Sequence, residues 1–234
     1  MNLRQLYGKM PDLKGFHTQE VELPQQKTFT LEHYKGRNYN TTVWSQYVLF
    51  PQQTGKLEIP SITFDGVVAQ QTVSDDPFDA FFNGGGYVEV KKKITTPKVV
   101  INVQPLPAKP AGFSGAVGEF KLASSINATD VKTNDAVTIK LTLSGTGNMK
   151  LIGTPEVKKN SRQDFEIYDP KVTDDYKLTN SGLTGTKTFE YLAIPRHAGN
   201  FTIPAVEFTY FDLKSNSYKT LKTEAYNLKV AKGQ

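Results

Sequence analysis

Apolar residues recur at every second position in several short segments, the pattern of a β-strand with one buried face. Residues 137–143 give the clearest case, with four apolar side chains on one face: Val137, Ile139, Leu141 and Leu143. Aromatic and β-branched runs over 43–50 and 189–194 stop at Pro51 and Pro195, which have no N–H to donate to a ladder. Short strands between Gly, Pro, Asn and Asp turns, with no helical stripe, predict an all-β fold.

The chain also contains an internal repeat. Residues 47–64 align without gaps to residues 191–208, with identical Tyr, Pro, Gly, Ile, Pro and Phe positions. Two further pairs of blocks match, 94–103 with 221–230 and, more weakly, 11–13 with 155–157. In both copies the apolar parity slips by one near a proline, Pro60 and Pro204, which predicts a bulge or a strand switch there.

The repeat predicts two tandem immunoglobulin-like β-sandwich domains. The domains are expected at 1–104 and 113–234, joined by a proline-rich, extended linker at 105–112. The second copy is preceded by strand patterns within 113–145, and the first copy has no counterpart to them. We therefore expect the first domain to lack its opening strands at the N-terminus; the alternative is that the first unit is naturally smaller. Its repeat blocks are also interrupted by an insertion, expected to be a loop over 70–90.

Composition excludes several classes of protein. Hydrophobic residues make up 38% and charged residues 22% of 234 residues, which suits a globular core. The net charge of +5 is too small and too dispersed for a nucleic-acid interface. The absence of cysteine excludes disulfides, thiolate nucleophiles and Cys-based metal sites. No apolar run reaches the ~18 residues of a membrane span, so the chain itself is expected to be soluble.

The insertion is the most unusual segment, because it places aromatic residues beside acids and a glycine run. The candidate docking residues are Phe78, Phe81, Phe82, Asp75, Asp76 and Asp79. Two interpretations stay open, a loop that docks a partner and a loop that folds back over its own domain. The three acids lack EF-hand spacing, so no metal site is predicted.

No other segment has the spacing of a catalytic or cofactor site. The histidines, His17, His33 and His197, fit no metal or triad pattern. The Gly145–Asn148 stretch is predicted to be a hairpin turn, and Lys91–Lys93 to protect a strand end from edge pairing. The strongest candidates for paired catalytic carboxylates lie in a turn-rich stretch where solvated acids are the default: Glu166, Asp169, Asp174 and Asp175. The sequence thus predicts no enzyme, cofactor or metal centre.

Several stretches together resemble the BatD family, the oxygen-tolerance proteins of the Bacteroides aerotolerance operon. They are GFHTQEVEL at 15–23, GRNYN at 36–40, QYVLFP at 46–51, FDAFFNGGG at 78–86, FSGAVG at 113–118, LSGTGN at 143–148, FEIYDPKVTD at 165–174, FEYLAIPRHAG at 189–199 and YKTLKT at 218–223. The set covers essentially the whole chain, and no stretch in it is catalytic.

The resemblance implies an exported, inner-membrane-anchored protein with several β-sandwich domains on the periplasmic side. Its signal peptide and membrane helix would lie outside this chain. It also implies partners in the same operon, a MoxR-type ATPase and membrane proteins with von Willebrand factor A domains. We therefore expect a protein-interaction module of an envelope complex linked to aerotolerance and oxidative stress. The alternative is a carbohydrate-binding or adhesive module that uses Trp44 and tyrosines such as Tyr39 as a stacking platform.

Overall fold

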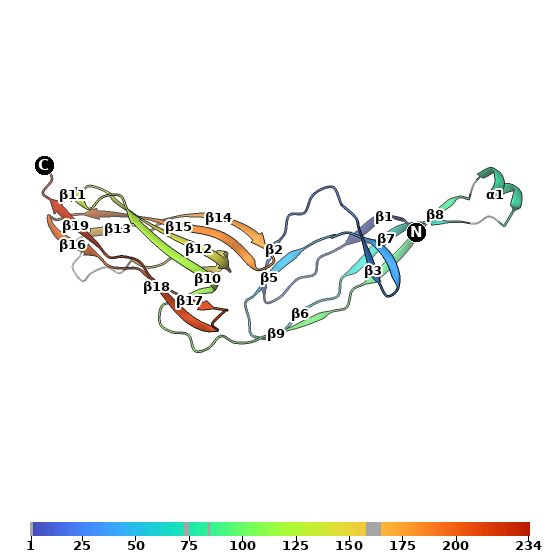
Figure 1. Cartoon of the computed structure of the whole chain (residues 1–234), viewed down its shortest axis with the longest axis horizontal. Coiled ribbons are helices and arrows are strands. Elements are labelled where there is room, and N and C mark those ends of the chain that lie inside the picture. Colours follow the sequence, from blue (N-terminus) through green and yellow to red (C-terminus); the bar gives the residue numbers. More distant parts are fainter. Residues whose placement is uncertain (1, 73–74, 84, 158–164) are drawn as a thin grey trace. The chain divides into compact units, whose positions relative to one another are not determined.

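The fold is all-β, as the sequence predicts (Figure 1). The computed structural model describes residues 2–72, 75–83, 85–157 and 165–234. Several sheets account for most of this part of the chain, as expected for β-sandwich architecture. The number of sandwich domains stays a prediction. No helix of the described residues has both the length and the apolar character that a membrane span requires.

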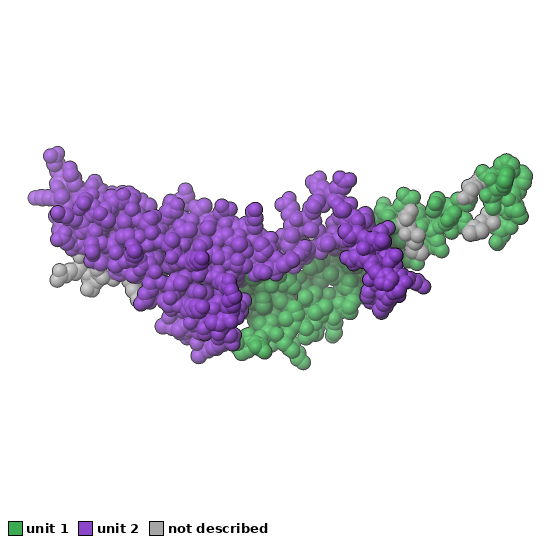
Figure 2. Space-filling model, in the orientation of Figure 1, with its two compact units in different colours: residues 1–18, 49–105 green, residues 19–48, 106–234 purple. Residues whose placement is uncertain are grey.

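The chain divides into two compact units (Figure 2). The first comprises Met1–Thr18 with Leu49–Pro105, and the second comprises Gln19–Val48 with Leu106–Gln234. The passage from Pro105 to Leu106 falls inside the predicted linker, 105–112. No pattern in the sequence predicted that 19–48 would group with the second unit. The domain bounds 1–104 and 113–234 stay a prediction.

The first unit contains a three-stranded and a two-stranded antiparallel sheet. The three-stranded sheet has the order β1-β7-β8, with β1 Asn2–Gly8, β7 Thr63–Gln71 and β8 Tyr87–Thr95. The two-stranded sheet pairs β6 Gly55–Ile59 with β9 Val99–Val103. A short helix, α1 Pro77–Asn83, lies between β7 and β8.

Two further pairs of strands come from residues 16–51. β2 Phe16–Glu20 pairs with β5 Tyr47–Pro51. β3 Thr30–Tyr34 and β4 Arg37–Thr41 form a hairpin whose turn places Lys35 and Gly36 at positive φ.

The second unit contains the larger sheets. A seven-stranded sheet has the order β13-β15-β12-β10-β17-β18, and β14 also pairs with β15. Its strands are β10 Phe113–Ile126, β12 Val137–Gly147, β13 Phe165–Ile167, β14 Lys171–Thr179, β15 Gly182–Pro195, β17 Glu207–Asp212 and β18 Ser217–Lys222. A three-stranded sheet has the order β11-β19-β16, with β11 Asp130–Lys132, β16 Gly199–Ile203 and β19 Tyr226–Ala231. A 3-10 turn, η1 Met149–Leu151, follows β12.

The core of the second unit draws on both of its sheets. The predicted alternation in β12 is confirmed, because its four apolar side chains are all buried and lie on the same face: Val137, Ile139, Leu141 and Leu143. Ile203 and Leu228 contribute from the smaller sheet, and both are almost fully buried. Burial of such side chains is worth about 1.5–3 kcal/mol each.

The internal repeat is confirmed by strand register. In the first copy Gly55 pairs with Val103 and Ile59 with Val99, and the aligned residues pair in the same way in the second copy: Gly199 with Val230 and Ile203 with Tyr226. The hairpins agree as well, because Phe64 opposite Ile94 corresponds to Phe208 opposite Leu221. The two copies therefore share the same arrangement of four strands, with β6, β7, β8 and β9 corresponding to β16, β17, β18 and β19.

The parity slip at each proline is a strand switch between sheets. β16 belongs to the three-stranded sheet of the second unit, and β17, which begins after three intervening residues, belongs to the seven-stranded sheet. β6 and β7 are divided between two sheets around Pro60 in the same manner. Two hydrogen bonds to a threonine stabilise each switch. The Ile62 N–H donates to the Thr96 hydroxyl, and the Thr96 N–H donates to the Ile62 carbonyl. Val206 and Thr223 make the same two hydrogen bonds in the second copy.

The predicted hairpin turn at Gly145–Asn148 is wrong. Gly145 and Gly147 lie inside β12, paired with β10 on one side and β15 on the other. A Cβ atom on Gly145 would collide with the backbone of Glu119 and Phe120. Glycine occurs there because two backbones approach closely, a second use of the residue besides turns.

Candidate interaction site at the tip of the β7–β8 hairpin

The insertion of the first copy is a lengthened hairpin rather than a loop throughout. In the second copy, the β17–β18 hairpin ends in a tight turn after Asp212 pairs with Ser217. The aligned pair in the first copy is Val68 with Val90, and from there the ladder continues to Gln71 opposite Tyr87. The sequence predicts a loop over 70–90, but both ends of this range are strand: β7 continues to Gln71, and β8 begins at Tyr87.

Local hydrogen bonds organise the tip. Thr72 donates both its N–H and its hydroxyl to the Gly86 carbonyl, at 2.8 and 2.6 Å. Helix α1 then begins at Pro77, a residue favoured in the first helical turn because its φ is already set. The carboxylate of Asp76 accepts a hydrogen bond from the Phe78 N–H at 3.0 Å and so caps the helix.

The three predicted phenylalanines lie together and face solvent. Phe78, Phe81 and Phe82 are 73%, 82% and 67% exposed. The spacing of three and four residues places Phe81 and Phe82 on the helical face of Phe78. Ring centroids are 4.7 Å apart between Phe78 and Phe82, and 5.3 Å apart between Phe81 and Phe82. Of the two interpretations of the insertion, these exposed rings favour the docking loop over a loop that covers its own domain.

The predicted acids accompany these rings. Asp75, Asp76 and Asp79 are all exposed, and Asp79 lies in the first turn of α1. The described residues contain no group of three His, Asp or Glu side chains that could hold a metal ion.

Sequence reasoning missed the contribution of the strand below the helix. Tyr87 and Val88 at the start of β8 are also exposed, and as neighbours in a strand they project from opposite faces of the hairpin. We call the exposed surface that Phe78, Phe81 and Phe82 form on α1 the aromatic tip.

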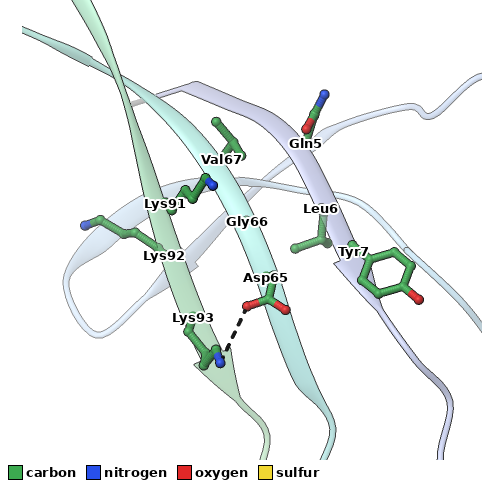
Figure 3. Close-up of a pocket in the computed structure, with 9 residues that line it drawn as sticks. All are labelled: Gln5, Leu6, Tyr7, Asp65, Gly66, Val67, Lys91, Lys92 and Lys93. Atoms are coloured by element: carbon green, nitrogen blue, oxygen red, sulfur yellow. Dashed lines mark ion pairs between the residues drawn. The ribbon is translucent and has the colours of Figure 1, made fainter.

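A separate hollow lies lower on the same sheet (Figure 3). It is lined by residues of all three strands: Gln5, Leu6, Tyr7, Asp65, Gly66, Val67, Lys91, Lys92 and Lys93. Lys93 forms a long, exposed ion pair with Asp65 at 4.0 Å. The lysines lie on β8, an edge strand of its sheet, as their predicted role against edge pairing requires.

Two of the acids considered for catalysis form ion pairs. Glu166 accepts hydrogen bonds from Arg196 at 2.7 Å and from the Tyr168 hydroxyl at 2.8 Å, and the Arg196 bond is the main cause of its lowered pKa. Asp174 lies 3.6 Å from Lys187. Asp169 and Asp175 are exposed. Ion pairing gives Glu166 and Asp174 a structural role, and the absence of an enzymatic activity stays a prediction.

The residues of the carbohydrate-binding alternative are accessible. Tyr39 is 46% exposed on β4, and Trp44 is 38% exposed in the segment that follows. Lys27 donates to the carbonyls of Val43 and Trp44 at 2.8 and 3.1 Å, which fixes the backbone beside the indole.

Comparison with known proteins identifies one domain. Residues 124–230, which include most of the second copy of the repeat, match a family model described as the BatD DUF11 like domain. No curated protein and no solved structure matches the chain.

Proposed function

From the match of residues 124–230 to the BatD DUF11 like domain, we propose that the chain belongs to the BatD family and is a non-enzymatic protein-interaction module. It acts on the extracytoplasmic face of the inner membrane, within an envelope complex linked to aerotolerance and oxidative stress. The observation that carries the interaction role is the aromatic tip.

Comparison of the two copies of the repeat indicates that the fold does not require the aromatic tip. The β17–β18 hairpin has the same register as β7–β8 and closes with a four-residue turn, 213–216, that contains no aromatic residue. A hairpin of this design therefore folds without an aromatic extension. Three exposed phenylalanines are costly in water, since burying each one is worth about 1.5–3 kcal/mol. Their retention at the tip is best explained by burial against a partner.

The acids beside the rings indicate the chemistry of that partner. Asp75, Asp76 and Asp79 repel an anionic lipid surface, so insertion into such a membrane is disfavoured. A protein pocket with an apolar floor and a basic rim complements both features. The family resemblance supplies candidate owners of such a pocket, the membrane proteins with von Willebrand factor A domains.

Replacement of Phe78, Phe81 and Phe82 by Ala tests this function. Purified von Willebrand factor A domains encoded in the same operon are the binding partners in the assay, and titration calorimetry measures the dissociation constant. We expect the triple variant to bind at least ~100-fold more weakly, because buried aromatic anchors dominate interface energetics.

The matched control changes three exposed apolar residues of the second unit to Ala: Val172, Leu192 and Leu213. The control is expected to bind as the wild type does, and circular dichroism checks that both variants are folded. Equal affinity of the wild type and the phenylalanine variant would contradict the proposed docking role.

Carbohydrate binding is the second candidate, favoured by the accessibility of Tyr39 and Trp44. Aromatic faces of this kind suit stacking against sugar rings. A glycan array distinguishes the two candidates, because the docking role requires no glycan ligand.

A further inference from the structure

Charge is divided along the β7–β8 hairpin. No lysine, arginine or histidine occurs between Lys56 and Lys91. The acids of this interval include the three that accompany the aromatic tip, Asp75, Asp76 and Asp79, and three lysines follow at 91–93. The hairpin is therefore negative at its tip and positive further down β8.

The lysines line the hollow in Figure 3 together with apolar side chains. Leu6, Tyr7 and Val67 supply the apolar part, and Gly66 lines the hollow from the middle strand without a side chain. The hollow has a volume of about 790 Å³, which is in the range of pockets that receive a ligand. We call it the basic hollow.

The basic hollow has a surplus of positive charge. Its three lysines are all exposed, and its lining contains one acid, Asp65. Asp65 pairs with Lys93, and Lys91 and Lys92 form no ion pair with any residue that the structure describes. Positive charge beside apolar surface is the combination that complements the aromatic tip.

The aromatic tip does not fill the basic hollow of its own chain. Its three rings are 67–82% exposed. The strand ladder also continues for four residues beyond the hollow, from Val67 opposite Lys91 to Gln71 opposite Tyr87. At ~3.3 Å per residue, this ladder separates the hollow from the base of the tip by about 13 Å. A second copy of the chain supplies a tip without bending this ladder.

We propose that the aromatic tip of one copy docks in the basic hollow of a second copy. The inference rests on the docking role proposed for the tip and adds a regulation of it, because a tip held by another copy cannot bind a partner protein. Tip and hollow are different surfaces of the chain, so the contact is heterologous and leaves one tip and one hollow free. Association therefore increases with concentration beyond two chains.

Two variants test this contact in the absence of any partner protein. The tip variant combines Phe78→Ala, Phe81→Ala and Phe82→Ala and keeps the hollow. The hollow variant replaces all three lysines of 91–93 by Glu and keeps the tip, and its glutamates still protect the edge of β8 from strand pairing. Sedimentation velocity measures association. We expect the wild type to associate, and each variant alone to associate at least ~10-fold more weakly.

A mixture of the two variants gives the sharpest result. One variant has an intact hollow and the other an intact tip, so a heterologous contact predicts a 1:1 complex that stops at two chains. The control reverses three exposed lysines of the second unit to Glu, Lys121, Lys177 and Lys229, and should associate as the wild type does. Circular dichroism checks that every variant is folded.

Salt provides a measurement that needs no variant. Opposite charges at a protein surface are screened by salt, so the wild type should associate more weakly at high ionic strength. Association that is insensitive to salt would contradict a contact between the acidic tip and the basic hollow.

Three further results would overturn the proposal: a wild type that stays monomeric at millimolar concentration, a hollow variant that associates like the wild type, or a mixture that forms no complex. Each leaves the docking role of the tip intact, because calorimetry with von Willebrand factor A domains tests that role separately. A monomeric wild type whose tip variant loses affinity for those domains would reject the contact between copies alone.

Discussion

Single glycines inside strands decide how closely the backbones of the second unit approach. Gly118 is paired with Gly147, and Gly145 with Gly185. A Cβ atom on Gly147 would approach the Phe120 ring to 2.9 Å as well as colliding with the Val117 carbonyl. Since strand propensity disfavours glycine, its presence at these pairs reflects contact between strands and not the preference of the local chain.

Gly145→Ala is expected to destabilise the second unit by on the order of 2–3 kcal/mol, because the added methyl group overlaps the β10 backbone. Chemical denaturation monitored by circular dichroism measures the change in the free energy of unfolding. Gly153→Ala is the control, because nothing lies within 4 Å of its Cβ position. Its expected effect is below about 0.5 kcal/mol. Similar losses in both variants would show that the close approach at Gly145 is unimportant.

Hairpins of identical register are closed differently in the two copies. At aligned cross-strand positions, a hydroxyl pair in one copy corresponds to an ion pair in the other. The Thr63–Thr95 hydroxyl pair aligns with the Glu207–Lys222 ion pair. The Asp65–Lys93 ion pair aligns with the Thr209–Thr220 hydroxyl pair. Hydroxyl pairs and opposite charges are both favourable across a sheet. The hairpins therefore tolerate either kind of cross-strand pair at the same position. The two copies differ mainly at the hairpin tips.

The turn of β17–β18 is organised by a buried carboxylate. Asp212 accepts hydrogen bonds from the Ser215 hydroxyl at 2.7 Å and the Ser215 N–H at 3.1 Å, and Lys219 lies 3.0 Å away. The Ser215 hydroxyl is the largest cause of a pKa of Asp212 well below the ordinary value, followed by the Lys219 ammonium. The aligned residue in the first copy is Val68, where the ladder continues instead of turning.

The lowered pKa predicts a pH dependence of stability. A carboxyl group whose pKa is lower in the folded state stabilises the protein above its unfolded pKa of about 3.9, and this stabilisation is lost as pH falls below that value. The wild type should therefore lose more free energy of unfolding on acidification than Asp212→Asn. Denaturant titrations across the acid range measure it, with the exposed Glu224→Gln as control. Parallel pH profiles of the wild type and Asp212→Asn would contradict the role given to this turn.

At the scale of the whole molecule, exposed apolar side chains are concentrated in the first half of the chain. Leu3, Tyr7, Ile94, Val99 and Val100 are all exposed and belong to the sheets of the first unit. Most of the buried apolar residues belong to the second unit. The hydrophobic contribution to stability follows the apolar area removed from water, so the two copies should differ in local stability.

Hydrogen exchange measured by mass spectrometry tests this difference. We expect amides of β6, β7 and β9 to exchange faster than those of the aligned strands β16, β17 and β19, because local opening costs less where fewer apolar groups are buried. β6 and β16 each pair with one strand in the same register, so hydrogen bonding is matched for these two strands. β19 also pairs with β11, whereas β9 pairs only with β6 within the described residues, so the comparison of β6 with β16 decides the test. Equal protection of aligned strands would show that burial does not limit opening.

Local pattern was enough to predict much of the candidate site. The aromatic and acidic residues of 75–82 stood out by composition, and the structure places Phe78, Phe81 and Phe82 on one exposed helical face. The helix was not predicted, since α1 spans only Pro77–Asn83 and so short a segment shows no period. The extension of the strands beneath it was also missed, because a ladder depends on which residue lies opposite.

The sequence by itself determined the all-β class, the repeat, the buried face of β12 and the slips of parity at Pro60 and Pro204, since alternation and proline act within one segment of chain. That each slip is a strand switch and not a bulge was decided by the sheet pairing. Only the tertiary structure decided that Gly145 and Gly147 lie between paired strands and that 19–48 groups with the second unit. It also decided that the sheet of the first unit ends at β1. The reason is physical: each of these depends on contacts between residues far apart in sequence, which no local period records.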